Sequence, residues 1–433
     1  MVWFVWLLSL SVVICGVSCG IDLGGGWSRT YAGSGQERVF CVATGRDGGY
    51  VLVGKSYSPE DGDACWLVKT DSEGLEEWNR SYGDYGGGFS VIGTDDGGFA
   101  ISGWTRSPGA VDGDFWLLKA DSEGLEEWNR SYVSAGEEAS YSMIQTRDGG
   151  YALTGYAERN GSHECWLVKT DPEGLEEWNR SYSHGSGVLA YRVVQTRDGG
   201  YALAGQTNYG TTVSSDIWLV KTDAEGLEEW TRTYDGGGSE VAMCMIETSD
   251  GGYALAGEER TFEPYVDRFL LLKTDGEGNA EWNRTYGDYG MLGGLGEEGL
   301  KIACSLTETR DWGYLLAGYM QRAGKVSDGW VMETDSRGRS LWSETYGGVG
   351  EDILFSLVPV EGGYAIAGWS DSHRPVDHDY WLVFVPERGG RRQRWIWVTV
   401  IGIGVVAVAG LVFTGAYARN RRMKDESHRE QEA

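Results

Sequence analysis

The segment Lys221-Thr-Asp-Ala-Glu-Gly-Leu-Glu-Glu-Trp230 decides the fold because the chain repeats it. Close copies begin at Lys69, Lys119, Lys169 and Lys273, and a divergent copy begins at Glu333. Each copy joins two β-rich stretches through Asp-x-x-Gly, where glycine supplies the positive φ that a tight hairpin needs. The segment therefore predicts a β-hairpin that recurs along one repetitive architecture.

A second landmark recurs with the hairpin at intervals of about 50 residues. It is an Asp-Gly-Gly-aromatic turn at Asp47, Asp96, Asp148, Asp198 and Asp250, with variants at Asp311 and Glu361. Each period then holds four short strands, which is the pattern of a propeller blade. The composition agrees, because 68 glycines and only 7 prolines, with 20 tryptophans and 24 tyrosines, favour short strands and tight turns over helices.

The repeat is offset at its two ends. It begins with a lone fourth strand at 26–31 and finishes with a third strand at 379–385 that no fourth strand follows. The surplus strand at one end matches the missing strand at the other. We therefore expect an all-β, seven-bladed β-propeller over 21–386, closed by an N-terminal strand that completes the last blade.

Two apolar segments flank the predicted propeller. Residues 1–20 form an apolar run ending in small residues, which is typical of a secretory signal, with an uncleaved anchor as the alternative. Residues 395–418 carry no charge and are long enough to cross a membrane as one helix. Basic residues lie on both sides of this span, in the linker 387–394 and the tail 419–433, so the signal decides the orientation. We expect a single-pass cell-membrane protein with its propeller outside and its tail in the cytoplasm.

Charge and cysteine content limit the function further. The formal net charge of −28 disfavours nucleic acid as a partner. Beyond the signal the cysteines are odd in number and contain no Cys-x-x-Cys motif: Cys41, Cys65, Cys165, Cys244 and Cys304. We expect small buried core residues, with a single disulfide left open.

The pattern Lys-Thr-Asp-x-x-Gly-x-x-x-Trp resembles the tryptophan-docking repeat of quinoprotein dehydrogenases and of the related outer-membrane assembly lipoprotein, the PQQ-repeat-like propellers. The resemblance covers about residues 26–385 at the level of the repeat, and is shared with cell-surface propellers of undefined function. It implies that the tryptophans lock neighbouring blades. The dehydrogenases typically have eight blades and an adjacent cysteine pair beside the cofactor. This chain has neither, so the resemblance implies the fold and no redox cofactor.

The two faces of the predicted propeller differ. Turns between the first and second and between the third and fourth strands are uniform, whereas the other connections vary, so we expect a binding site on the variable face. The residue after the second-strand glycine should face this side in each blade: Lys55, Trp104, Tyr156, Gln206, Glu258, Tyr319 and Trp369. Four of these are aromatic. They form either a platform for stacking on sugars or side chains, or a cover for the rim.

Acidic residues mark the start of each third strand: Asp63, Asp114, Glu164, Asp216, Asp267, Asp328 and Asp379. One acid per blade places the carboxylates too far apart to share an ion, so we expect each to cap its own loop. The pairs Asp61/Asp63, Asp112/Asp114 and Asp377/Asp379 are the better local candidates for calcium.

Two other sets of residues carry predictions. Asn79, Asn129, Asn160, Asn179 and Asn283 begin Asn-x-Ser/Thr triplets and are candidate N-glycosylation sites outside the cell, with shared repeat ancestry as the alternative reason for four of them. The hairpin lysines should be structural. In the divergent copy Glu333 replaces the lysine while Arg337 and Arg339 appear nearby, which indicates charge compensation.

No nucleophile elbow, P-loop or metalloprotease motif occurs in the sequence. His163/Glu164 and His373/Asp377/His378/Asp379 are the only loop clusters that offer acid, base or metal chemistry. We therefore expect a monomeric, membrane-anchored extracellular propeller for binding or adhesion, which recognises a cell-surface glycan or protein through its variable face. A glycan-active hydrolase or lyase and a structural envelope component are the alternatives.

Overall fold

Seven antiparallel four-stranded sheets contain all the regular secondary structure of the described residues. The computed structural model describes residues 26–33, 35–58, 62–83, 86–106, 113–134, 136–159, 161–209, 214–262, 265–287, 301–321, 326–372 and 378–388. Within these ranges no helix is long and apolar enough to span a membrane. The predicted signal at 1–20 and the predicted span at 395–418 lie outside them.

The sheets follow one another along the chain as blades. Blade one is β2 (Gln36–Thr44), β3 (Tyr50–Ser58), β4 (Gly62–Thr70) and β5 (Glu76–Tyr82), and blade two is β6 (Gly86–Gly93), β7 (Phe99–Thr105), β8 (Asp114–Ala120) and β9 (Glu126–Tyr132). Blade three is β10 (Glu138–Gln145), β11 (Tyr151–Arg159), β12 (Ser162–Thr170) and β13 (Glu176–Tyr182), and blade four is β14 (Val188–Gln195), β15 (Tyr201–Thr207), β16 (Ile217–Thr222) and β17 (Glu228–Tyr234). Blade five is β18 (Ser239–Glu247), β19 (Tyr253–Phe262), β20 (Tyr265–Thr274) and β21 (Ala280–Tyr286), and blade six is β22 (Lys301–Glu308), β23 (Tyr314–Gln321), β24 (Ser327–Thr334) and β25 (Ser340–Tyr346).

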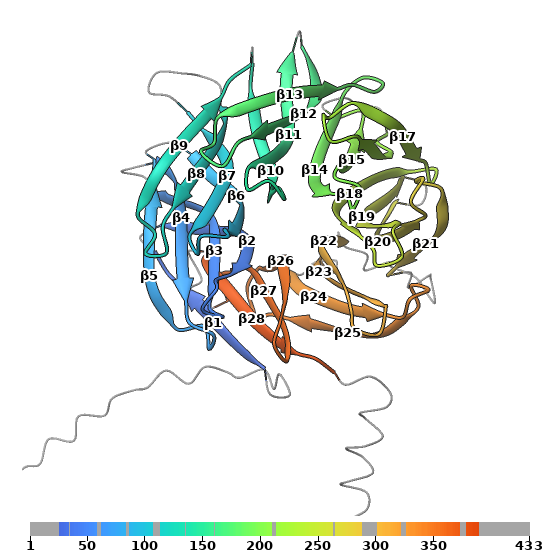
Figure 1. The fold of residues 1–433 in the computed structure, drawn as a ribbon. Helices are drawn as coiled ribbons and strands as arrows, with labels where there is room; N and C mark the ends of the chain where they lie inside the picture. Colours follow the sequence, from blue (N-terminus) through green and yellow to red (C-terminus); the bar gives the residue numbers. More distant parts are fainter. Residues whose placement is uncertain are drawn as a thin grey trace, which may run out of the picture. The chain divides into compact units, whose positions relative to one another are not determined.

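Blade seven combines the two ends of the propeller. Its strands are β26 (Asp352–Val360), β27 (Gly363–Ser370), β28 (Asp379–Pro386) and β1 (Trp27–Tyr31), in the spatial order β1-β28-β27-β26. Strand β1 pairs antiparallel with β28 from Trp27 opposite Phe384 to Tyr31 opposite Tyr380. Figure 1 shows β1 beside β28 in the closed ring. The predicted closure of the seven-bladed propeller is confirmed.

The apolar core is divided among the junctions between blades. Seven clusters of buried residues each combine side chains from two neighbouring blades, including one between blades seven and one. Tyr31 of β1 belongs to that cluster and is 4% exposed. Because each blade hides its two faces against its neighbours, the ring is stabilised by apolar burial all the way round.

The repeated tryptophans lie against the hairpins of the following blades. The Trp78 indole fits over Gly124, where an added Cβ would lie 2.6 Å from the ring, and the Tyr82 hydroxyl donates to the carbonyl of Gly124 over 2.7 Å. The same pair of contacts recurs at Gly74, Gly174, Gly226, Gly278 and Gly338. Each glycine has positive φ and has no side chain, so it satisfies the turn and leaves room for the indole.

The hairpin lysines are buried ion-pair centres, which confirms the structural role predicted for them. Lys221 contacts Asp198 of the Gly-Gly turn and Glu229 of the outer strand, each over 2.8 Å, and donates to the Thr222 carbonyl. Lys69, Lys119, Lys169 and Lys273 make equivalent contacts. In blade six Glu333 accepts a hydrogen bond from Trp342 Nε1 instead, and Arg339 pairs with Asp335 over 2.8 Å.

The five cysteines of the propeller are free and buried: Cys41, Cys65, Cys165, Cys244 and Cys304. Their expected role as small core residues is confirmed. Burial raises the pKa of the Cys65 and Cys165 thiols to about 12, so both remain protonated.

Candidate functional site

Every innermost strand carries a β-bulge. Its pairing with the second strand skips one residue in each blade: Phe40, Phe89, Tyr141, Tyr191, Met243, Cys304 and Phe355. A bulge inserts one extra residue and re-aims the side chain. The innermost strands β2, β6, β10, β14, β18, β22 and β26 surround the middle of the ring (Figure 1), so the bulges repeat around its axis.

Five of these bulge residues form a continuous series of ring contacts, which we call the aromatic arc. Its ring centroids are separated by 5.6 Å for Phe355 and Phe40, 5.1 Å for Phe40 and Phe89, 5.1 Å for Phe89 and Tyr141, and 5.5 Å for Tyr141 and Tyr191. Such spacings are typical of favourable aromatic pairs. All five side chains are partly exposed, so the arc extends across blades seven, one, two, three and four as an apolar surface.

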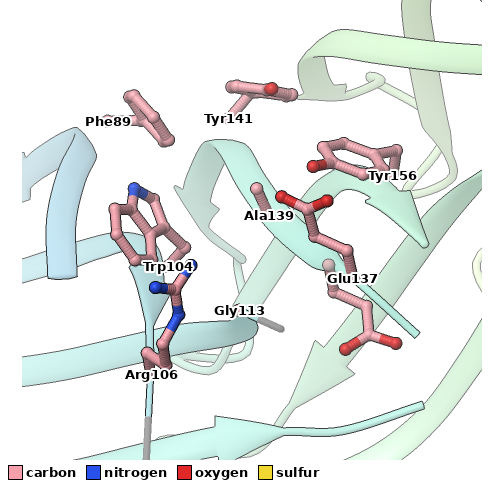
Figure 2. Close-up of a pocket in the computed structure, with 9 residues that line it drawn as sticks. Phe89, Trp104, Arg106, Gly113, Glu137, Ala139, Tyr141 and Tyr156 are labelled. Atoms are coloured by element: carbon pink, nitrogen blue, oxygen red, sulfur yellow. The ribbon is translucent and has the colours of Figure 1, made fainter. Parts of the chain in front are cut away.

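A cavity of about 200 Å³ lies beside the arc between blades two and three. It is lined by Phe89, Trp104, Arg106, Gly113, Glu137, Glu138, Ala139, Tyr141 and Tyr156. In Figure 2 the side chains of Trp104 and Arg106 face those of Tyr141, Tyr156 and Glu137 across the cavity. Arg106 and Gly113 flank the connection between β7 and β8, and Glu137 precedes β10, so the cavity opens among the variable connections.

Charged groups border this aromatic cavity. The Arg106 guanidinium lies 5.6 Å from the centre of the Trp104 ring, in cation–π range. Glu137 is exposed, whereas Glu138 is fully buried. Burial, together with the charge of Asp114, raises the pKa of the Glu138 carboxyl, and hydrogen bonds from Ser134 and Gly136 oppose this rise. The cavity thus offers ring faces, hydrogen-bond donors and carboxylate acceptors within one small volume.

The structure brings some of the predicted platform residues together. Trp104 and Tyr156 both line the cavity, and Tyr156 stacks on Tyr141 with centroids 5.9 Å apart. Tyr319 lies 6.3 Å from Phe355, at the other end of the arc. These three aromatic residues therefore extend the arc outward along the second strands.

The other four predicted platform residues lie apart from the cavity. Lys55 forms an ion pair with Asp63 over 3.3 Å, and Glu258 forms one with Arg260 over 3.5 Å. The Arg38 guanidinium lies 5.2 Å from the centre of the Trp369 ring, and the His378 ring centroid lies 4.3 Å from that of Trp369. Gln206 pairs with Leu189 and Ile217 in blade four.

The candidate calcium pairs fall in three separate places. Asp63 lies in β4 of blade one, where it pairs with Lys55, and Asp61 lies outside the described residues. Asp114 begins β8 in blade two and Asp379 begins β28 in blade seven, while Asp112 and Asp377 lie outside the described residues. Asp114 acts electrostatically on Glu138, and Asp379 acts on Glu37. Asp114 and Asp379 therefore each add to the rise in the pKa of a buried glutamate at the start of the next blade.

The candidate glycosylation sites lie on the outer strands. Asn79, Asn129 and Asn283 are exposed and Asn179 is half-buried, while Asn160 lies outside the described residues. The Asn79 amide nitrogen donates to Glu76 over 2.7 Å, and that of Asn179 donates to Glu176 over 2.6 Å. Glycosylation at either position would use one of the two N–H groups on this amide nitrogen.

Sequence reasoning missed the bulge residues, although the repeat contains a signal for them. A four-residue phrase with a large or sulfur-containing second residue precedes each Gly-Gly turn: Val-Phe-Cys-Val at 39–42, Gly-Phe-Ser-Val at 88–91, Ser-Tyr-Ser-Met at 140–143, Ala-Tyr-Arg-Val at 190–193, Ala-Met-Cys-Met at 242–245, Ala-Cys-Ser-Leu at 303–306 and Leu-Phe-Ser-Leu at 354–357. Strict alternation assigns this residue to one face of a regular strand. The bulge makes it an axial residue instead.

The fold and the cavity define a seven-bladed β-propeller with an aromatic site beside its axis. No protein-family model and no curated protein matches the chain. Among solved structures, the chain is similar to a protein of unknown function from Bacteroides caccae, at 13% identity over 59% of this chain and 83% of that one, with a TM-score of 0.40. It is also similar to two structures of Sqt1 from Chaetomium thermophilum. One is 11% identical over 78% of this chain and 80% of that one (TM-score 0.46), and the other is 11% identical over 83% and 97% (TM-score 0.48). The propeller assignment rests on the seven sheets themselves, and the resemblance of the repeat to quinoprotein-like propellers stays an expectation.

Proposed function

We propose that this propeller is a binding module that takes a glycan at the aromatic arc and the adjoining cavity. The observation that carries the proposal is the unbroken contact series from Phe355 to Tyr191, which leads past the cavity. Partly exposed aromatic faces stack on the apolar C–H faces of sugar rings, while the Arg106 and Glu137 side chains offer hydrogen bonds to hydroxyl groups.

The volume of the cavity and the net charge of the chain limit the class of glycan that can bind. A cavity of about 200 Å³ is smaller than the ~300 Å³ at which pockets for drug-sized ligands begin, so it suits one ring of a longer chain whose other rings contact the arc. The net charge of −28 repels polyanions. A neutral or amino-bearing polysaccharide therefore fits better than an acidic one.

The location is part of the same proposal. The apolar run at 1–20 and the uncharged segment 395–418 support a membrane-anchored chain with its propeller outside the cell. A propeller held at the cell surface would meet envelope polysaccharides, which the arc and the cavity would retain.

Binding of the purified full chain to neutral, amino-bearing and acidic polysaccharides, measured by calorimetry, tests the proposal. We expect a neutral or amino-bearing polymer to bind, and Trp104→Ala and Tyr141→Ala each to weaken binding about tenfold through the lost ring face. The control is Trp312→Gly, because Trp312 is an exposed aromatic residue on a turn between first and second strands, which belong to the opposite face.

Three results would contradict this assignment. Binding that Trp312→Gly weakens as much as Trp104→Ala would move the ligand away from the cavity. Retention of a protein but of no polysaccharide would replace the glycan by a protein ligand. Release of shortened sugars during the incubation would show hydrolase or lyase activity in place of simple binding.

A further inference from the structure

Three carboxylates converge at the junction of blades four and five. Asp216 precedes β16, Asp235 follows β17 and Glu240 lies in β18, the innermost strand of the next blade. One oxygen atom of each side chain lies within 4.8 Å of the others. A single cation at about 2.4 Å from each oxygen spans such separations.

Glu240 points to a ligand independently of this clustering. Its side chain is 1% exposed, and its Oε1 accepts the Gly238 amide over 3.0 Å. Its Oε2 is buried, and no hydrogen-bond donor from the described residues reaches it. A buried carboxylate oxygen without a donor is costly, and a coordinated cation removes that cost.

The charges around the cluster are unbalanced. No lysine or arginine of the described residues forms an ion pair with Asp216, Asp235 or Glu240. Burial raises the pKa of Glu240, and the charges of Glu259 and Asp235 add to the rise. Burial and Asp235 likewise raise the pKa of Asp216, against the opposing charge of His184. A bound cation relieves this mutual repulsion.

The equivalent junctions between other blades show how the junction of blades four and five differs from them. Glu37 and Glu138 occupy the position of Glu240 in blades one and three, and each has a buried Oε2 that no described donor reaches. The junctions differ, however, in the residue that follows the tyrosine at the end of each outermost strand. In order around the ring this residue is Ala32, Gly83, Val133, Ser183, Asp235, Gly287 and Gly347. Among the described residues, a third carboxylate therefore joins such a pair only between blades four and five.

We propose that Asp216, Asp235 and Glu240 bind a calcium ion that joins blade four to blade five. Calcium suits three carboxylates from separate segments, because it accepts six to eight oxygen ligands in irregular geometry. Magnesium requires a near-ideal octahedron with shorter bonds and retains most of its water. Water completes the coordination on the side of the exposed Asp235.

Calorimetric titration of the metal-free full chain with calcium and with magnesium tests this proposal. We expect one calcium site with a dissociation constant between micromolar and about 1 mM, weaker magnesium binding, and a melting temperature that calcium raises by several degrees. Asp235→Ser introduces the residue of a sister junction at an exposed position, and Glu240→Gln keeps the hydrogen bond to Gly238. Each should weaken calcium at least about tenfold.

The control is Glu138→Gln at the junction of blades two and three, which should leave calcium affinity unchanged. The proposal is overturned if about 10 mM calcium produces neither binding heat nor a shift in melting temperature. It is also overturned if Asp235→Ser binds calcium as tightly as the unmodified chain, or if magnesium binds as tightly as calcium.

Discussion

Trp381 Nε1 donates a hydrogen bond to Ser28 Oγ over 2.7 Å, although 353 positions separate the two residues in the sequence. This bond lies within the ladder between β1 and β28, which completes blade seven. It shows that the two ends of the propeller stabilise one sheet. We therefore expect the stability of the ring to depend on β1.

Replacing Tyr31 tests this dependence. Tyr31 is buried between blades seven and one, and its hydroxyl donates to the Gly74 carbonyl over 2.8 Å, so Tyr31→Ala should lower the free energy of unfolding by about 3 kcal/mol. The exposed Tyr57 is the control, since Tyr57→Ala should cost well under about 1 kcal/mol. Urea unfolding of both variants checks the difference, and equal costs would mean that β1 does not contribute to the core.

The effect of the contact between Trp78 and Gly124 on stability can be measured by comparing Gly124→Ala with the same substitution at a turn glycine that has open space around it. Gly124 has a φ of 73° and an added Cβ would meet the indole at 2.6 Å, whereas Gly199 has a φ of 95° with no atom within 4 Å. Gly199→Ala should cost about 1 kcal/mol of backbone strain, and Gly124→Ala should cost about 1–3 kcal/mol more. If thermal unfolding gives the same loss for both variants, the indole does not press on the hairpin.

Trp312 offers a stabilising substitution. It has a φ of 62° at the position where sister turns place Gly48, Gly97, Gly149, Gly199 and Gly251, and its side chain is 62% exposed. Trp312→Gly should remove left-handed strain and raise the free energy of unfolding by about 1 kcal/mol. A decrease in the denaturation midpoint would show that the indole makes a contact that outweighs the strain.

The free energy of unfolding depends on pH through two groups of carboxyls, and their effects have opposite signs. Burial disfavours ionisation of Asp96, Asp198 and Asp250, but hydrogen bonds from the buried lysines and the turn threonines lower their pKa to about 2. Their contribution is complete above about pH 4 and is lost as the pH falls toward 2. Burial raises the pKa of Glu37, Glu138 and Glu240, so stability falls as the pH rises from about 4.5 through those values.

Stability without added calcium should therefore be highest in mildly acidic solution, which denaturation midpoints measured between about pH 2 and 8 would show. Lys221→Met removes the partner of Asp198 and should reduce the loss on the acid side. A midpoint that keeps rising from pH 5 to pH 8 would contradict the account given for the three glutamates.

The sequence predicted the ring because its determinants are local and repeated. Gly124 and Trp128 specify a hairpin wherever their pattern occurs, and counting such hairpins gives the number of blades. The extra strand at 26–31 then predicts the closure without any knowledge of distances.

The aromatic arc and the cavity could not be predicted from the repeat pattern in the same way. Tyr141 belongs to the axis because its strand skips a pairing position, and a bulge is invisible to a pattern that assumes alternating faces. Trp369 was expected either in a stacking platform or as a cover for the rim, and Arg38 from β2 and His378, directly before β28, contact its ring. Contacts of this kind depend on which blades meet, and only the closed fold supplies that information.

The pairing of β1 with β28 also fixes an order of events during synthesis. Trp27–Tyr31 is the first strand of the propeller to leave the ribosome, but its partner follows only once residues 379–386 have been translated. The earliest strand is consequently the last to find its hydrogen-bonding partner.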